Sequence, residues 1–100
     1  MSVIVIGRMT VDPANVAKIW VDRKADFEGV AARAKAAGAL HHRWGFGDNE
    51  VIIVDEWRDA ASFQKFFDNE TVIPQLMQAG GVQGAPEFTI VEAKDAPDSF

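Results

Sequence analysis

One hundred residues suffice for one domain with a two-layer core, and we expect a single domain over residues 1–100, with 94–100 as a tail. The net charge of −5 and the scattered basic residues exclude a nucleic-acid-binding protein, because the phosphate backbone requires a basic face. The absence of cysteine excludes disulfides, thiol nucleophiles and thiolate metal sites.

The N-terminal segment starts with a short apolar run, Val3-Ile4-Val5-Ile6. This run has neither the basic lead nor the length of a signal peptide, and it predicts a strand. No segment of the chain has the apolar length that spans a bilayer. We therefore expect a cytoplasmic protein without membrane partners.

The first predicted elements are a strand and a helix. A β-branched run over Val3–Met9 predicts a buried strand. Asp12 can cap the helix that follows, with Pro13 in its first position, where the missing N–H costs nothing. Apolar residues then recur at helical spacing up to Gly38, which predicts one helix with Gly29 as a candidate kink.

A hairpin and two shorter helices complete the middle of the chain. Strands over Leu40–Phe46 and Val51–Trp57 flank a turn in which Asp48 and Asn49 tolerate left-handed backbone angles. Asp59 caps the second helix, which extends through Asp68 and buries a stripe of three phenylalanines, Phe63, Phe66 and Phe67. A further helical piece covers 70–79, and the last strand covers 88–93.

The order strand, helix, strand, strand, helix, strand predicts an α+β, ferredoxin-like βαββαβ fold. Its four-stranded antiparallel sheet would carry the helices on one face, leaving the other face uncovered. Apolar residues on strands 1, 3 and 4 are available for that face: Val3, Val5, Ile52, Val54 and Val91. We therefore expect a homodimer in which two sheets pack face to face.

Residues 3–93 resemble the dimeric α/β-barrel superfamily. The resemblance rests on the strand end Val54-Asp55-Glu56-Trp57, the link Arg58-Asp59, the helix 60–67 and the Pro-Glu pair before the last strand. The superfamily includes antibiotic-biosynthesis-type monooxygenases, haem-degrading monooxygenases and stress-responsive barrel proteins. The resemblance implies a dimeric α/β barrel, and it implies either an enzyme or a ligand-binding protein.

Three departures from the family pattern bear on activity. Leu76 stands where haem-degrading members carry a haem-ligating histidine, and the first strand lacks their asparagine. Phe66 stands where many antibiotic-type members carry histidine. The comparison therefore predicts that haem is not a substrate, and we expect no cofactor.

The hairpin register brings a histidine and a carboxylate together. With Asp48 and Asn49 at the turn, His42 lies opposite Asp55 on one face of the sheet. The functional interpretation is a general base, His42, oriented by Asp55 in a ligand pocket. The walls of that pocket would be aromatic: Trp20, Trp44, Trp57, Phe63 and Phe67. The structural interpretation is a hydrogen bond that only stabilises the hairpin.

Three more polar residues, His41, Arg43 and Glu56, alternate onto the opposite face. They are expected either to form ion pairs across the dimer interface or to bind an anion. A metal site is not predicted, because neighbouring histidines on a strand point to opposite faces and His42 and Asp55 lack a third ligand.

Two functions remain open from the sequence. The first is a cofactor-independent monooxygenase, or a related isomerase or lyase, that acts on an aromatic or polyketide-like small molecule. The second is a non-catalytic barrel of the stress-responsive type that binds a small ligand or a protein partner. An open cavity lined by His42 favours the enzyme, and a filled interior favours the second function.

Overall fold

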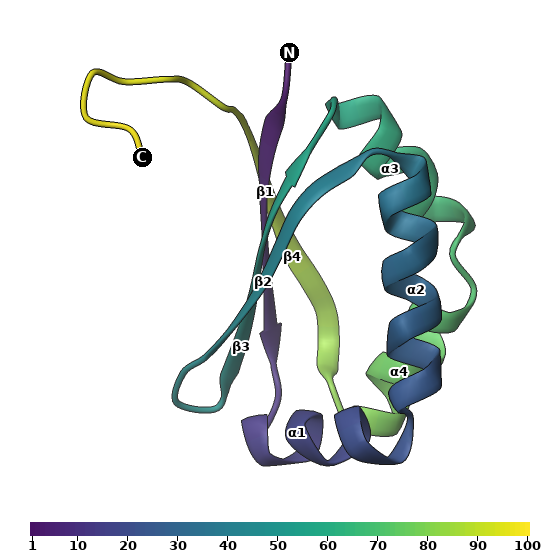
Figure 1. Cartoon of the computed structure of the whole chain (residues 1–100). Helices are drawn as coiled ribbons and strands as arrows, with labels where there is room; N and C mark the ends of the chain where they lie inside the picture. The colour runs from purple at the N-terminus through teal and green to yellow at the C-terminus, as the bar shows by residue number, and fades with distance from the viewer.

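The computed structural model describes all residues from 1 to 100. Its elements, in chain order, are β1 (Val3–Thr10), α1 (Pro13–Asp22), α2 (Lys24–Ala37), β2 (Ala39–Phe46), β3 (Glu50–Trp57), α3 (Ala60–Asn69), α4 (Val72–Gly80) and β4 (Gln83–Glu92). The strands form one antiparallel sheet in the order β2-β3-β1-β4. In Figure 1, α2, α3 and α4 lie on one face of the sheet, and no helix covers the other face. The predicted α+β, ferredoxin-like fold is confirmed.

The β2–β3 hairpin has the predicted turn. Asn49 adopts the left-handed region (φ 51°), and the Gly47 N–H donates to the Glu50 carbonyl over 2.8 Å. As predicted, His42 is in register with Asp55. A bulge at Leu40 interrupts the pairing farther from the turn.

The bulge changes which residue at the start of β2 pairs with Trp57. Ala39, and not Leu40, is in register with Trp57, and Ala39 packs against the buried cluster that contains Trp57. Leu40 is 54% exposed. Strict alternation does not hold between Ala39 and His41, because a bulge inserts one residue into the period of two.

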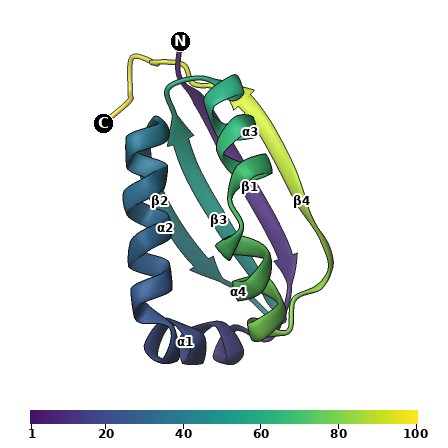
Figure 2. The same cartoon turned by 90° about the vertical axis from the view of Figure 1, so that its right-hand side faces the viewer.

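The single long helix predicted between Pro13 and Gly38 is wrong. The chain forms two helices that meet at Arg23, whose backbone (φ −126°, ψ 34°) is not helical, and α2 continues through Gly29 without a break. In Figure 2, α1 lies across one end of the sheet, whereas α2 extends along it. Arg23 occupies the position four residues after Ile19 in the apolar stripe, so the stripe is interrupted where the chain changes direction.

The last strand is longer than predicted, because β4 begins at Gln83 and not at Phe88. Its register against β1 shifts between Arg8 and Thr10, and Gly84 has a positive φ of 70°. β4 is an edge strand, where a proline such as Pro86 is tolerated because no ladder partner is needed on one side. Glycine and proline, as in Gly84-Ala85-Pro86, are typical of loops, so the sequence did not predict this extension.

Aspartates begin two of the helices, as predicted. Asp12 Oδ1 accepts the Ala14 N–H over 3.0 Å at α1, and Asp59 Oδ1 accepts the Ser62 N–H over 2.6 Å at α3. None of the helices combines the length and the apolar composition that crossing a membrane requires.

Few side chains are fully buried, and they form two separate clusters. The first contains Met9, Val11, Val16 and Val51, and the second contains Val5, Trp57 and Phe63. Only 10 of the 100 residues are buried, so the clusters do not merge into one continuous core. The layer between sheet and helices therefore contains unfilled space.

The uncovered sheet face carries a different apolar set from the one predicted. Val5 is 2% exposed and packs under the helices, and Val3 packs against the same cluster. Alternation along β1 instead turns Ile4 and Ile6 to the outer face. The outer apolar residues are Ile4, Ile6, Ile52, Val54 and Val91.

Candidate functional site

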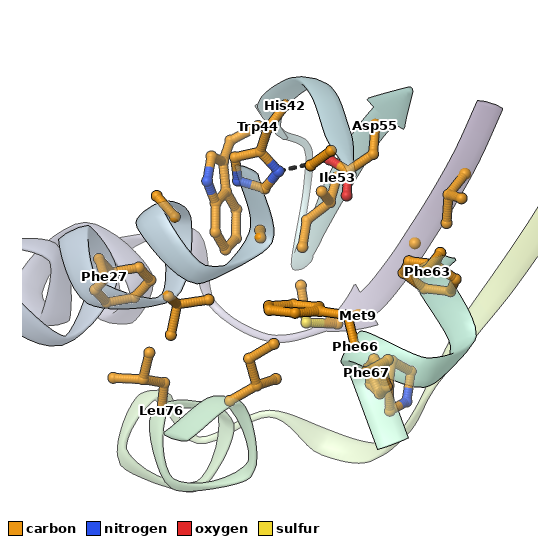
Figure 3. Close-up of a pocket in the computed structure, with 18 of the residues that line it drawn as sticks. Met9, Phe27, His42, Trp44, Ile53, Asp55, Phe63, Phe66, Phe67 and Leu76 are labelled. Atoms are coloured by element: carbon orange, nitrogen blue, oxygen red, sulfur yellow. Dashed lines mark hydrogen bonds and ion pairs between the residues drawn. The ribbon is translucent and has the colours of Figure 1, made fainter. Parts of the chain in front are cut away.

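A cavity of about 410 Å³ lies between the sheet and the helices. Both buried clusters contribute to its walls, through Met9 and Val16 on one side and Val5, Trp57 and Phe63 on the other. Figure 3 shows Phe27 of α2, Phe66 of α3 and Leu76 of α4 around the same space. This volume lies in the range of pockets that hold small organic ligands.

The cavity is mainly apolar: 21 of its 28 lining residues are hydrophobic. Its titratable lining residues are Lys35, His41, His42 and Asp55. Such a wall binds an aromatic or aliphatic body through burial of apolar surface, and the few polar groups determine its orientation.

His42 and Asp55 form the pair that the hairpin register predicted. His42 Nδ1 lies 2.5 Å from Asp55 Oδ1, and the dashed line in Figure 3 marks this contact. The His42 side chain is 45% exposed, whereas that of Asp55 is only 12% exposed. A neutral imidazole that donates through Nδ1 leaves the Nε2 lone pair free, so His42 can accept a proton from a bound molecule.

Asp55 has a second partner that the sequence did not reveal. The Trp57 indole N–H donates to Asp55 Oδ2 over 3.1 Å. Asp55 and Trp57 lie two residues apart on β3, so alternation places both on the helix-facing side. Alternation predicted only that Trp57 forms a wall of the pocket, and the direction of its N–H depends on how the ring packs.

Four of the five predicted pocket residues line the cavity, namely Trp44, Trp57, Phe63 and Phe67. Trp20 does not line it, which corrects the prediction. Its ring stacks on Phe46 (centroids 5.0 Å apart) and meets Trp44 edge-on (5.4 Å). Trp20 therefore packs behind Trp44, because α1 turns away from the sheet at Arg23 and α2 supplies the nearer aromatic ring, Phe27.

Most of the lining residues on α2 and α4 were not predicted from the sequence. They are mainly apolar: Val30, Ala31, Ala34, Ile73, Leu76 and Met77, with Lys35 as the one charged member. Their helical spacing was visible as an amphipathic stripe, but a stripe does not distinguish a side chain that fills the core from one that lines a cavity.

The three residues predicted for the opposite face, His41, Arg43 and Glu56, lie on the paired strands β2 and β3. His41 is in register with Glu56, and Arg43 is in register with Val54. Glu56 accepts a hydrogen bond from the Ser2 hydroxyl over 2.6 Å, and none of the three forms an ion pair within the chain. His41, which follows the bulge, is also among the residues that line the cavity.

The helix α2 covers the cavity without burying a single side chain. Arg33 on α2 donates two hydrogen bonds, of 2.8 and 2.9 Å, to Glu70 between α3 and α4. These bonds lower the pKa of Glu70, against the opposing effect of its partial burial. This bidentate pair joins α2 to the α3–α4 segment across the layer of helices.

No protein-family model matches the sequence, and no curated protein matches it. Solved structures do match over nearly the whole chain. SnoaB, a cofactor-independent oxygenase from Streptomyces nogalater, is 18% identical, with 98% of both chains covered and a TM-score of 0.60. The monooxygenase from ActVA-Orf6 of Streptomyces coelicolor, solved with nanaomycin D, is 16% identical, with 95% of this chain and 89% of that chain covered and a TM-score of 0.67.

A conserved protein from Methanosarcina mazei Go1 has the same fold, with 17% identity, 94% of both chains covered and a TM-score of 0.68. At these identities the likeness shows a shared fold. The resemblance to antibiotic-biosynthesis-monooxygenase-like α/β-barrel proteins is therefore confirmed for the fold. It assigns no activity to His42 or Asp55.

Proposed function

We propose that this protein is an enzyme of the cofactor-independent monooxygenase type that acts on an aromatic, polyketide-like small molecule. The observation that carries the proposal is the His42–Asp55 pair in the wall of an otherwise apolar cavity of about 410 Å³. The oxygenases among the structures of the same fold support the type of reaction. The substrate binds in the cavity with an acidic phenol or enol hydroxyl at His42 Nε2.

In the proposed reaction, His42 is the general base and Asp55 orients it. Nε2 takes the hydroxyl proton, and the resulting anion is electron-rich at a ring carbon. That carbon transfers electrons to O₂ and forms a C–O bond, and the imidazolium returns its proton to the peroxide, giving a hydroperoxide. The hydrogen on that carbon and the outer OH of the hydroperoxide then leave as water, which gives a quinone carbonyl, so one oxygen atom enters the product and the other leaves as water. The substrate supplies all the electrons, and the reaction needs no added reductant.

The aromatic walls and Asp55 have separate roles in the proposal. The walls Trp44, Phe63 and Phe67 exclude water from the anion, which would otherwise be protonated again. The Asp55 carboxylate, whose side chain is only 12% exposed, holds the imidazolium that forms through its contact with Nδ1.

The test is oxygen-dependent turnover of an anthrone, which enolises to a tricyclic phenol. Turnover is measured through O₂ uptake and quinone absorbance. His42→Ala should lower turnover by about 10²–10⁴-fold, the usual contribution of a general base. The control is Lys18→Ala, which truncates an exposed side chain of α1 that does not line the cavity and leaves the hydrogen bond between His42 and Asp55 intact. It should retain turnover within a few-fold.

A wild-type protein that binds the phenol without consuming O₂ would contradict the oxygenase proposal and favour the ligand-binding function. A His42→Ala protein with normal turnover and a lowered melting temperature would show that the pair only stabilises the hairpin. Circular dichroism on each variant establishes that the sheet is intact.

We also propose that the enzyme is a homodimer, formed by packing the uncovered sheet faces of two copies together. Val54 and Val91 on this face are 43% and 46% exposed, and Ile4, Ile6 and Ile52 adjoin them. A contiguous apolar face of this kind is stable in water when a partner covers it. His41 and Arg43 then lie close to the partner's sheet.

Sedimentation equilibrium tests this assembly and should give twice the chain mass of 10.9 kDa. Val54→Lys places a charge within the apolar face and should yield a monomer. Val21→Lys is the control, because Val21 is 78% exposed on α1, away from the sheet face. A stable wild-type monomer at micromolar concentration would contradict the proposed dimer.

A further inference from the structure

Both oxygen atoms of the Asp55 carboxylate are occupied by partners within the chain. Oδ1 is 2.5 Å from His42 Nδ1, and Oδ2 accepts the Trp57 indole N–H over 3.1 Å. The Asp55 side chain is 12% exposed, so water has little access to it. The carboxylate is therefore held from two sides, by the candidate base and by an indole.

Trp57 is itself held in place. It is 1% exposed, and its ring contacts Phe63 (centroids 5.5 Å apart) and Phe66 (5.3 Å) of α3. Its backbone is in register with Val3 on one side and Ala39 on the other. A side chain packed on all sides keeps one rotamer, so the direction of the indole N–H is determined by the packing of α3 against β3.

We propose that Trp57 is a positioning residue for the His42 base. The proposal rests on the function proposed above and extends it. The χ2 torsion of aspartate is broad, so a carboxylate with one partner can rotate. The indole bond holds the Asp55 carboxylate in the orientation that accepts Nδ1–H of His42. This selects the tautomer whose free lone pair is on Nε2.

The other titratable residues that line the cavity, Lys35 and His41, form no hydrogen bond with Asp55 and remain unchanged in the test.

The test compares Trp57→Phe with Trp44→Phe. Trp57→Phe retains an aromatic ring in the packed cluster and removes the N–H donor to Asp55, together with part of the indole volume. Trp44→Phe also removes an indole, on the neighbouring strand and 5.6 Å from the His42 ring, but this indole does not bond to Asp55. The readout is NMR titration of the His42 ring nitrogens in the ligand-free protein.

In Trp57→Phe, the Nδ1–H tautomer of neutral His42 should be less populated than in the wild type, because the Asp55 carboxylate is no longer held by the indole. With a turned-over phenol, kcat should fall about tenfold while KM changes less, because the orientation of the base is lost and an aromatic ring remains in the wall. Trp44→Phe should leave the tautomer population of His42 in place. A Trp57→Phe protein whose His42 ring-nitrogen resonances superimpose on those of the wild type would overturn the proposal.

A second measurement on the wild-type protein covers the case in which Trp57→Phe does not fold. The Trp57 indole ¹H resonance should shift as His42 titrates, since both groups share one carboxylate, whereas that of Trp20 should not. Lack of this shift overturns the positioning role. If the indole resonance shifts but no O₂-dependent turnover is seen, the Trp57–Asp55–His42 coupling stands and the oxygenase reaction is refuted. The two failures are therefore distinguishable.

Discussion

Two tryptophans on neighbouring strands face the same layer, yet their surroundings differ. Trp57 is 1% exposed and packs against α3, whereas Trp44 is half-buried beneath α2, beside His42. We refer to Val5, Trp57 and Phe63 as the packed side, and to Trp44, Phe27 and His42 as the open side. The Trp57 indole on the packed side bonds to Asp55, which contacts His42, and the open side leaves room for a ligand.

The helices explain this difference. α3 buries Phe63 and presents Phe66 and Phe67 beside it, so its apolar stripe fills the space over β3. Apart from Phe27, α2 places mainly alanines and Val30 over the sheet, and these side chains are too small to reach across the layer. Large side chains on one helix and small ones on the other produce a cavity on one side of the interior.

The largest expected effect is on the packed side. Trp57→Ala should lower the free energy of unfolding by about 3–5 kcal/mol, because it leaves a cavity in a filled cluster. Trp44→Ala should lower the free energy of unfolding by less than about half of that amount, since the site of Trp44 is already partly open. Urea denaturation of the two variants measures the difference, and equal losses would contradict the division of the interior into two sides.

A pair of substitutions on α2 should sharpen the comparison. Ala31 lines the cavity, whereas Ala37 packs against the Val5–Trp57–Phe63 cluster. Ala37→Leu should therefore overpack the interior and destabilise the fold by about 1–3 kcal/mol. Ala31→Leu should change stability by less than about 1 kcal/mol, because it extends into empty space.

The same pair separates stability from binding. Ala31→Leu should weaken the binding of the fluorescent probe anilinonaphthalene sulfonate about fivefold or more, since it fills part of the cavity. Ala37→Leu should leave the probe affinity of the folded protein nearly unchanged. Unchanged probe binding in Ala31→Leu would show that the probe binds elsewhere.

The smallest expected effect concerns the ion pair that joins α2 to the α3–α4 segment. Hydrogen bonds from Arg33 lower the pKa of Glu70 in the folded state. The contribution of the Glu70 carboxylate to stability is therefore fully present above the pKa that Glu70 has in the unfolded chain. It is lost as the pH falls through the lower pKa that Glu70 has in the folded protein. Glu70→Gln should lower the melting temperature at neutral pH.

The effect of Glu70→Gln should disappear in acid, where the wild-type carboxylate is protonated as well. Melting curves of both proteins between neutral and acidic pH give this comparison. A difference in melting temperature that persists unchanged at the lowest pH would show that Glu70 acts through packing and not through its charge.

Short-range sequence patterns were enough to predict the hairpin register and two helix starts. A period of two along β2 and β3, with the turn at Asp48 and Asn49, was enough to place His42 opposite Asp55. The aspartate caps at Asp12 and Asp59 marked two helix starts correctly. These features depend on neighbours within a few residues or across one hairpin, where geometry follows from spacing.

Other features depended on the tertiary structure. At Arg23 the apolar stripe is interrupted, but neither glycine nor proline marks a helix end there, and α1 leaves the path of α2 because Val16 packs at the end of the sheet. The cavity and the Trp57–Asp55 bond depend on how far side chains from α2 and α3 extend across the layer. Helical spacing identifies the face that packs inward, but only the packed structure determines whether that face fills the space or leaves it open.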